Sequence, residues 1–319
     1  MPGFATHHIF GVNAYHRIPD INLKNIIKKH KKAYALGLQG PDLFFYFFPT
    51  SAGLKVKIAN KLHKEKTDTF MKELINACRT VTDEDSFETN VAYICGFVGH
   101  YILDTSVHPY VYHRVGTRSS KETLGIHFGL ETDIDREVLL HYCNRKMTDF
   151  DHRKAINVSK SETISIAKLL HKAILSTYDE DLTISLIKAA IGSFKLESAL
   201  IMDKNNHKQK IFSFLETHTL KHEFLTPLLI NEVEHMEDPC NTEHKKWSNP
   251  WDGDFSSDES VFDIMDKKAN EYASAMVLMS DALKKAYNNI PDSNPLIIKT
   301  LGRLSYTSGL DWEIPISRD

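Results

Sequence analysis

Apolar residues recur at helical spacing along most of the chain. This periodicity is typical of amphipathic helices that bury one face. β-branched alternation, which is typical of strands, is missing except for a short stretch near the C-terminus. The pattern therefore predicts an all-α protein, with helices over 23–38, 52–78, 87–106, 124–142, 162–200, 208–224 and 258–290.

The stretch 87–106 differs from the others because it is apolar on almost every side, from Val91 to Gly99. A helix of this kind is buried at the centre of a domain. Asp83 and its acidic neighbours suit the N-terminus of that helix. Pro109 should end it, because proline cannot donate the next helical hydrogen bond.

We expect one helical domain over 1–290 and an appended C-terminal tail over 291–319. The segment 238–254 is rich in proline, tryptophan and polar residues, which predicts a long ordered loop. The aromatic run Phe44–Phe48 is expected to pack into the core rather than to contact lipid or substrate.

Composition excludes some classes of function. A net charge of −3 gives no sign of a nucleic-acid surface, and the four scattered cysteines make a thiolate zinc site or a disulfide scaffold improbable. The start of the chain lacks the pattern of a signal peptide, and no apolar run is long enough to span a membrane. We therefore expect a cytoplasmic protein. Its 17 histidines are an ample supply of metal ligands at neutral pH.

The predicted central helix contains His100 and Asp104, four residues apart and so on one face. Burying a carboxylate is costly unless it is paired or bound to a metal, and this helix offers no Lys or Arg for Asp104. His108 follows one turn later. A second pair with the same spacing, His127 and Glu131, lies on the next helix. Two such helices are how metal sites are built in helical bundles, and nitrogen and oxygen ligands suit catalytic zinc.

The chain also resembles the zinc-dependent phospholipase C family, specifically its cytoplasmic branch. The resemblance rests on an ordered set of motifs within 1–140: Met1-Pro2-Gly3-Phe4 with Thr6-His7, Gly40-Pro41-Asp42-Leu43-Phe44-Phe45-Tyr46, Leu62-His63-Lys64-Glu65-Lys66, Gly99 through Tyr110, and His127 to Glu131 with Asp133 and Asp135-Arg136.

The resemblance implies an α-helical bundle of the phospholipase C and zinc nuclease type that carries up to three zinc ions. It implies one zinc on Asp42, His63, His100 and Asp104, and a second on His108, His127 and Glu131. The third would bind His7 and Asp104, with the Asp104 carboxylate bridging. It also implies a catalytic role for Asp42, which could accept the proton of the attacking water.

Some assignments stay open at this stage. His113 is the alternative to His108, which the bend expected at Pro109 favours. The secreted members of the family bind the third zinc through an N-terminal Trp amine, for which the Pro2 amine is a candidate substitute. Asp133 and Asp135 could orient ligand histidines, or Asp135 could pair with Arg136 or face solvent. His8 should point away from the site, and His16, His30, His141 and His152 are expected at the surface.

The leading hypothesis is a zinc-dependent phosphodiesterase of phospholipase C type, acting on a phospholipid or a soluble phosphodiester. A single-strand nuclease is the near alternative, but it is not favoured because basic residues do not alternate with the aromatic ones. A non-catalytic zinc-binding helical protein is the alternative from a different class. An iron or manganese carboxylate bundle fits less well, because such sites use Glu-rich pairs at i, i+3.

Overall fold

The computed structural model confirms an all-α architecture, and it describes residues 3–45, 47, 56–118, 120–219, 221–291 and 295–316. One two-stranded antiparallel sheet occurs within these ranges. The elements are α1 Phe4–Arg17, α2 Ile21–Lys29, α3 Lys31–Gly37, η1 Gly40–Phe44, α5 Val56–Lys64, α6 Thr67–Ala77, η2 Cys78–Thr80, α7 Glu84–Val115, α8 Lys121–Cys143, η3 Met147–Asp149, α9 His152–Ala155, α10 Lys160–Tyr178, α11 Ile184–Leu200, α12 His207–Thr219, η4 Thr226–Leu228, β1 Trp247–Ser248, β2 Ser256–Ser257, α13 Val261–Tyr287 and α14 Pro295–Leu301.

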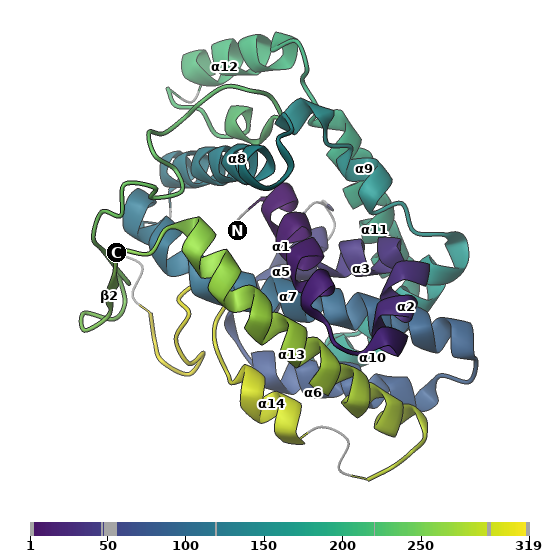
Figure 1. Cartoon of the computed structure of the whole chain (residues 1–319). Coiled ribbons are helices and arrows are strands. Elements are labelled where there is room, and N and C mark those ends of the chain that lie inside the picture. The colour runs from purple at the N-terminus through teal and green to yellow at the C-terminus, as the bar shows by residue number, and fades with distance from the viewer. Residues whose placement is uncertain are drawn as a thin grey trace.

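Helix α7 is the buried axis of the fold, as its all-round apolar sequence predicts. It packs against α1, α2, α3, α8, α10 and α13, and α13 runs alongside it across the molecule (Figure 1). Gly37 of α3 and Gly96 of α7 allow the closest of these approaches. A Cβ at either position would lie within 2.2 Å of a carbonyl oxygen on the other helix. The Asp83 side chain caps the N-terminus of α7 as expected.

The prediction that Pro109 ends this helix is wrong, because α7 continues to Val115. Proline has no N–H, so one helical hydrogen bond is lost. In a helix interior this usually destabilises the protein by about 3 kcal/mol. Val107, Tyr110 and Val111 are buried on either side of it, so packing outweighs that cost.

Three of the predicted helices are interrupted, and the described part of one of them, 52–78, is divided between α5 and α6, with Lys66 in the left-handed conformation. The segment 23–38 forms α2 and α3, because the backbone of His30 leaves helical geometry at the junction. The segment 162–200 is divided between α10 and α11, with Asp179 in the left-handed conformation at the end of α10. Single left-handed residues of this kind are common helix terminators.

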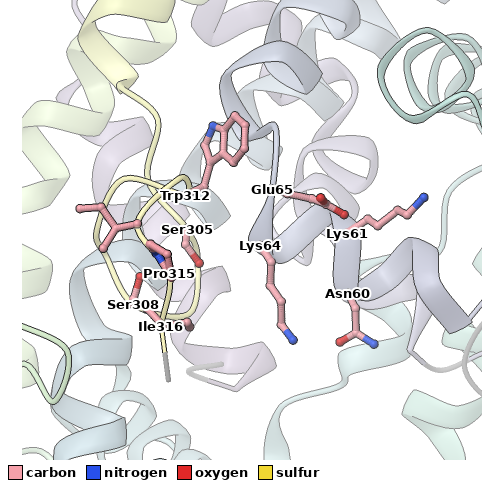
Figure 2. A pocket seen from close by; sticks show the side chains of 10 residues that line it. Asn60, Lys61, Lys64, Glu65, Ser305, Ser308, Trp312, Pro315 and Ile316 are labelled. Carbon is pink, nitrogen blue, oxygen red and sulfur yellow. The ribbon is translucent and has the colours of Figure 1, made fainter. Parts of the chain in front are cut away.

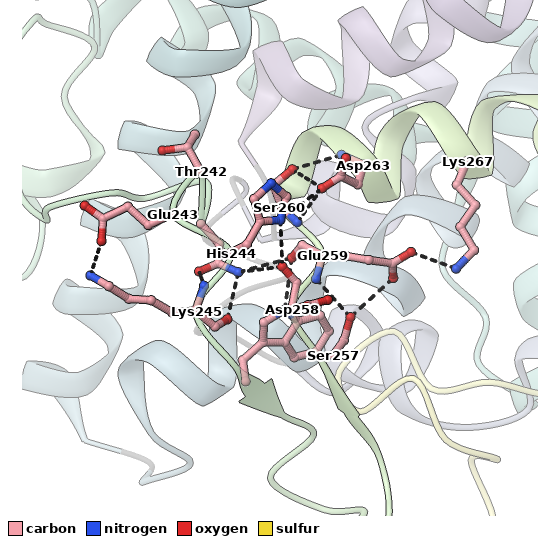
Figure 3. Close-up of polar contacts among 12 residues, drawn as sticks. Thr242, Glu243, His244, Lys245, Ser257, Asp258, Glu259, Ser260, Asp263 and Lys267 are labelled. Carbon is pink, nitrogen blue, oxygen red and sulfur yellow. Dashed lines mark hydrogen bonds and ion pairs between the residues drawn. The ribbon is translucent and has the colours of Figure 1, made fainter.

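The predicted loop 238–254 is followed by β2 and then by α13, which begins at Val261. Its N-cap Ser260 and Asp263 form a reciprocal capping box, and Glu259 pairs with Lys267 (Figure 3). The Trp247 indole donates to the carbonyl of Glu259, which ties the hairpin to the start of the helix. The loop 238–254 is therefore ordered by hydrogen bonds rather than by regular structure, apart from β1.

The boundary between a domain over 1–290 and a tail over 291–319 stays a prediction. The described part of that tail, 295–316, packs closely on the rest of the chain. The Tyr101 hydroxyl donates to Leu301 and accepts from the N–H of Leu304, and the Trp312 indole donates to Asp68.

Candidate metal centre

The structure brings eight predicted ligands together from five elements. His7 lies on α1, Asp42 on η1 and His63 on α5. Helix α7 supplies His100, Asp104 and His108, and α8 supplies His127 and Glu131. All eight side chains are buried. They form three groups whose ligand atoms lie within 4.8 Å of one another: His7, His100 and Asp104; Asp42, His63 and His100; and His108, His127 and Glu131.

Asp104 is the centre of this arrangement. Its Oδ1 lies 3.1 Å from His7 Nε2, and its Oδ2 lies 3.2 Å from His100 Nε2 and 3.8 Å from His108 Nδ1. The side chain is 0% exposed. No Lys or Arg of the described chain lies within ion-pairing distance of it. Among the described residues, the groups available to neutralise this carboxylate are imidazoles, or a cation held between them.

The other two groups have similar spacing. Asp42 Oδ1 lies 3.0 Å from His63 Nε2 and 4.0 Å from His100 Nε2. His100 therefore belongs to two of the three groups, the one with His7 and the one with Asp42, which are called the inner groups. Glu131 Oε1 lies 2.7 Å from His127 Nε2 and 3.7 Å from His108 Nε2.

The donor set fits zinc. Bonds of about 2.0–2.1 Å in a tetrahedral site place neighbouring ligand atoms about 3.3 Å apart, close to most of these separations. Several buried atoms of these groups make no hydrogen bond: both nitrogens of His7, Nε2 of His100 and of His108, and both oxygens of Asp104. Buried polar atoms are rarely left without a partner, so this group indicates a cation site.

Backbone carbonyls orient three of the imidazoles. The Nδ1 atoms of His63 and His100 lie 2.7 Å and 3.1 Å from the carbonyl oxygens of Ala59 and Leu38, and His108 Nδ1 contacts that of Tyr306. An N–H on Nδ1 leaves the Nε2 lone pair available as a ligand. The sequence alone does not predict these contacts. The Leu38 and Tyr306 carbonyls lie far along the chain from their histidines, and Ala59 belongs to no distinctive sequence pattern.

Burial and charge set the protonation of the site. Burial lowers the pKa of His7 to about 4, and neighbouring His100 adds to this effect. Burial also lowers the pKa of His108 to about 3. Burial alone would lower the pKa of His100, but the carboxylates of Asp104 and Asp42 outweigh it and raise that pKa. The pKa of Asp104 is held well below its usual value because His100 and His108 outweigh its burial. His7 and His108 are thus neutral at pH 7, as metal ligands must be.

For Asp135 the sequence left three roles open: orienting a ligand histidine, pairing with Arg136, or facing solvent. Asp135 accepts from the N–H groups of Ala5 and Thr6 and from the Thr6 hydroxyl, at 2.6–2.8 Å. It therefore fixes the start of α1, directly before His7, and it neither pairs with Arg136 nor faces solvent. Asp133 bonds instead to Arg136 and to the backbone of His235 and Met236, away from the ligand histidines.

Other predictions about histidines had mixed outcomes. His16, His113 and His141 are exposed, and His113 lies away from the three groups. The prediction that His30 and His152 lie at the surface is wrong, because both are buried. His30 fills the α2–α3 junction beside Glu162, and His152 packs edge-on against Phe4. Met1 and Pro2 lie outside the described residues, so the Pro2 amine hypothesis stays untested.

The aromatic run after Asp42 is only partly in the core. Phe44 is buried, but Phe45 is exposed and its ring centroid lies 5.0 Å from that of His63. Phe45 therefore stands at the edge of the ligand cluster rather than inside the core. Tyr46 and Phe48 lie outside the described residues.

A cavity of about 510 Å³ lies beside α5, and none of the eight predicted ligands is among its lining residues. Figure 2 shows it between α5 and the C-terminal loop that Tyr306 belongs to. The N–H of Tyr306 donates to the His63 carbonyl, so this loop forms one wall of both cavity and cluster. The cavity is lined by cationic, hydroxyl and aromatic side chains that include Asn60, Lys61, Lys64, Ser305, Ser308 and Trp312.

Comparison with known proteins now decides the family. Residues 6–185, more than half of the chain, match the family model described as zinc dependent phospholipase C. The chain belongs to the zinc-dependent phospholipase C family. It follows that its cofactor is zinc and that its chemistry is that of a family of hydrolases. No curated protein and no solved structure matches the chain. Within the described ranges, every helix is too short or too polar to cross a bilayer.

Proposed function

We propose that this zinc-dependent phospholipase C family member hydrolyses phosphodiesters with up to three zinc ions. The observation that supports it is the sharing of ligands. His100 belongs to two of the groups of three. Asp104 lies close to His7 and His100 of the inner groups and also to His108 of the third group. Shared ligands keep cations within a few ångströms of one another, which is the arrangement that phosphodiester cleavage by metal clusters requires.

In this proposal Asp42, His63, His100 and Asp104 hold one zinc, and His108, His127 and Glu131 hold a second. His7 and Asp104 hold the third. When bound, zinc supplies charge that stabilises phosphate oxygens and lowers the pKa of a water molecule.

Asp42 is the proposed catalytic residue. It stands on the one-turn helix η1 at the edge of the cluster, beside exposed Phe45. Its Oδ1, which lies 3.0 Å from His63 Nε2, would bind zinc, and its other oxygen would accept the proton of the attacking water.

Assays on three substrates test the proposal: a soluble aryl phosphodiester, phosphatidylcholine and single-stranded DNA. Wild-type protein should cleave the aryl phosphodiester and phosphatidylcholine. Asp42→Asn should reduce this cleavage strongly while the protein stays folded. Cleavage of DNA alone would instead identify a nuclease. A third outcome would identify a non-catalytic zinc protein: zinc-loaded wild type cleaves none of the three substrates, and Asp42→Asn lowers its stability.

A further inference from the structure

Helix α12 exposes large apolar side chains far from the core. Ile211, Phe212, Phe214 and Leu215 are 40–61% exposed, and they lie on one side of the helix by its 3.6-residue period. Glu216 is the single buried residue of α12. These four residues are called the α12 patch. Helix α12 stands at the periphery of the molecule, beyond α8 (Figure 1). Exposed apolar groupings of this kind mark sites of interaction.

The patch continues toward the helix that carries His127. After α12, Leu225 is exposed, and on α8 so are Leu124 and Ile126, the residue just before His127. The two regions pack closely, because a Cβ at Gly125 would lie 2.2 Å from the Glu223 carbonyl oxygen. The Thr132 hydroxyl also donates to the carbonyl of Pro227. Exposed apolar side chains therefore occur both on α12 and at the N-terminal end of α8, and the segment after α12 packs against α8.

The charges around the patch are sorted by sign. The carboxylate of Glu216 accepts from three backbone N–H groups and the Thr226 hydroxyl. Asp203 accepts from the N–H of Gln209, and Glu223 from the Ser213 hydroxyl. These three acidic groups are thus bonded within the protein, whereas Lys204, Lys210 and Lys221 are exposed; at the start of α8, Lys121 and Glu122 are both exposed. Apolar side chains flanked by exposed lysines are typical of surfaces that insert into anionic membranes.

We propose that the α12 patch docks on an anionic phospholipid surface and brings the α8 side of the ligand cluster to the lipid. This inference rests on the proposed function, because it explains how the enzyme reaches a phospholipid although no described helix could span a membrane. The charge sorting favours this occupant over a second copy of the chain, which would place the exposed lysines of both copies against each other.

Sedimentation with vesicles tests the proposal. The vesicles contain phosphatidylcholine with or without phosphatidylglycerol, and the variants are Ile211→Ser/Phe214→Ser and Lys204→Glu/Lys210→Glu. Both sites are exposed, so the variants should fold. We expect each double variant to bind the anionic vesicles at least about tenfold more weakly than wild type. Leu140→Ser, an exposed leucine near the other end of α8, is the matched control and should bind like wild type.

Equal binding by wild type and both double variants would overturn the proposal. So would a wild-type dimer that the Ile211→Ser/Phe214→Ser variant dissolves, since a second copy would then cover the patch. Hydrolysis of a soluble aryl phosphodiester separates this proposal from the proposed function, because both double variants should retain it. If wild type did not hydrolyse this substrate, the proposed function would be refuted. The vesicle binding would then still test whether the α12 patch docks on anionic lipid.

Discussion

The His100/Asp104 pair of α7 and the His127/Glu131 pair of α8 have the same sequence spacing but different surroundings. Asp104 is fully buried at the crossing of helices and contacts the imidazoles of His7, His100 and His108. Glu131 is buried less deeply and belongs to one group of three. Equal local spacing therefore places both pairs on a helical face, but tertiary structure decides how many ligands each pair joins.

Replacing the two carboxylates should separate the pairs most clearly. Asp104→Asn removes the charge that three imidazoles share, so we expect loss of bound zinc and an activity about a thousandfold lower. Glu131→Gln affects one group, and its activity should fall at least about tenfold less than that of Asp104→Asn. Elemental analysis and phosphodiester hydrolysis measure both effects. Equal losses in the two variants would show that Asp104 is not shared.

A matched pair of glycines tests the same contrast without changing a ligand. Gly40 has a φ of +50°, and a Cβ there would lie 2.2 Å from the His100 ring. Gly40→Ala should therefore displace His100, lower activity at least about tenfold, and cost about 1–2 kcal/mol of stability from backbone strain alone. Gly129 lies between His127 and Glu131, but its Cβ would meet only the His235 side chain, at 3.1 Å. Gly129→Ala should retain most of the activity. The comparison fails if Gly129→Ala is the more damaging change.

Two aspartates of α8 extend the comparison to supporting residues. Asp135→Asn weakens the hydrogen bonds that fix the start of α1, so it should cost about 1–3 kcal/mol of unfolding free energy and weaken zinc binding at His7. Asp133→Asn disturbs bonds to Arg136 and to the 235–236 backbone, away from the cluster. It should lower stability similarly with full zinc content. Urea unfolding and zinc titration give the two readouts, and normal zinc affinity in Asp135→Asn would exclude the positioning role.

The smallest expected effect concerns a buried histidine outside the cluster. Burial lowers the pKa of His152 from 6.5 to about 4, so below pH 6.5 the unfolded chain takes up a proton that the folded protein excludes. Stability contributed by this group is present above pH 6.5 and is lost as the pH falls toward 4. Between about pH 7.5 and 5.5 the loss is about 1 kcal/mol.

His152→Phe should make the free energy of unfolding less dependent on pH by that amount, while His141→Phe, at the surface, should not. Urea unfolding at several pH values measures the slopes. Identical slopes in wild type and His152→Phe would contradict the assignment.

Much of the fold follows from local pattern. The helical periodicity predicts the positions of α8 and α13 closely, and the apolar sequence of α7 predicts its central place. The errors occur where tertiary packing overrides local preference. Pro109 lies inside a helix because its neighbours are buried on both sides, and His30 interrupts a helix because its side chain enters the interior.

The candidate site was predictable to the extent that its ligands share a helix. The i, i+4 pairs of α7 and α8 can be found from spacing and the absence of a local cation. Asp42, His63 and His7 came from the family motifs instead, because no local pattern links three separate segments. The sequence could not decide between Asp133 and Asp135 as a supporting residue, and it did not predict the Tyr306 carbonyl, because each acts through a contact between segments distant in sequence.

Anomalous diffraction at the zinc absorption edge, from crystals of purified wild-type protein, tests the central claim most directly. The account predicts three peaks: one beside His7 and Asp104, one among Asp42, His63, His100 and Asp104, and one among His108, His127 and Glu131. Peaks bound to other side chains, or no peak near Asp104 in a protein that hydrolyses phosphodiesters, would contradict it.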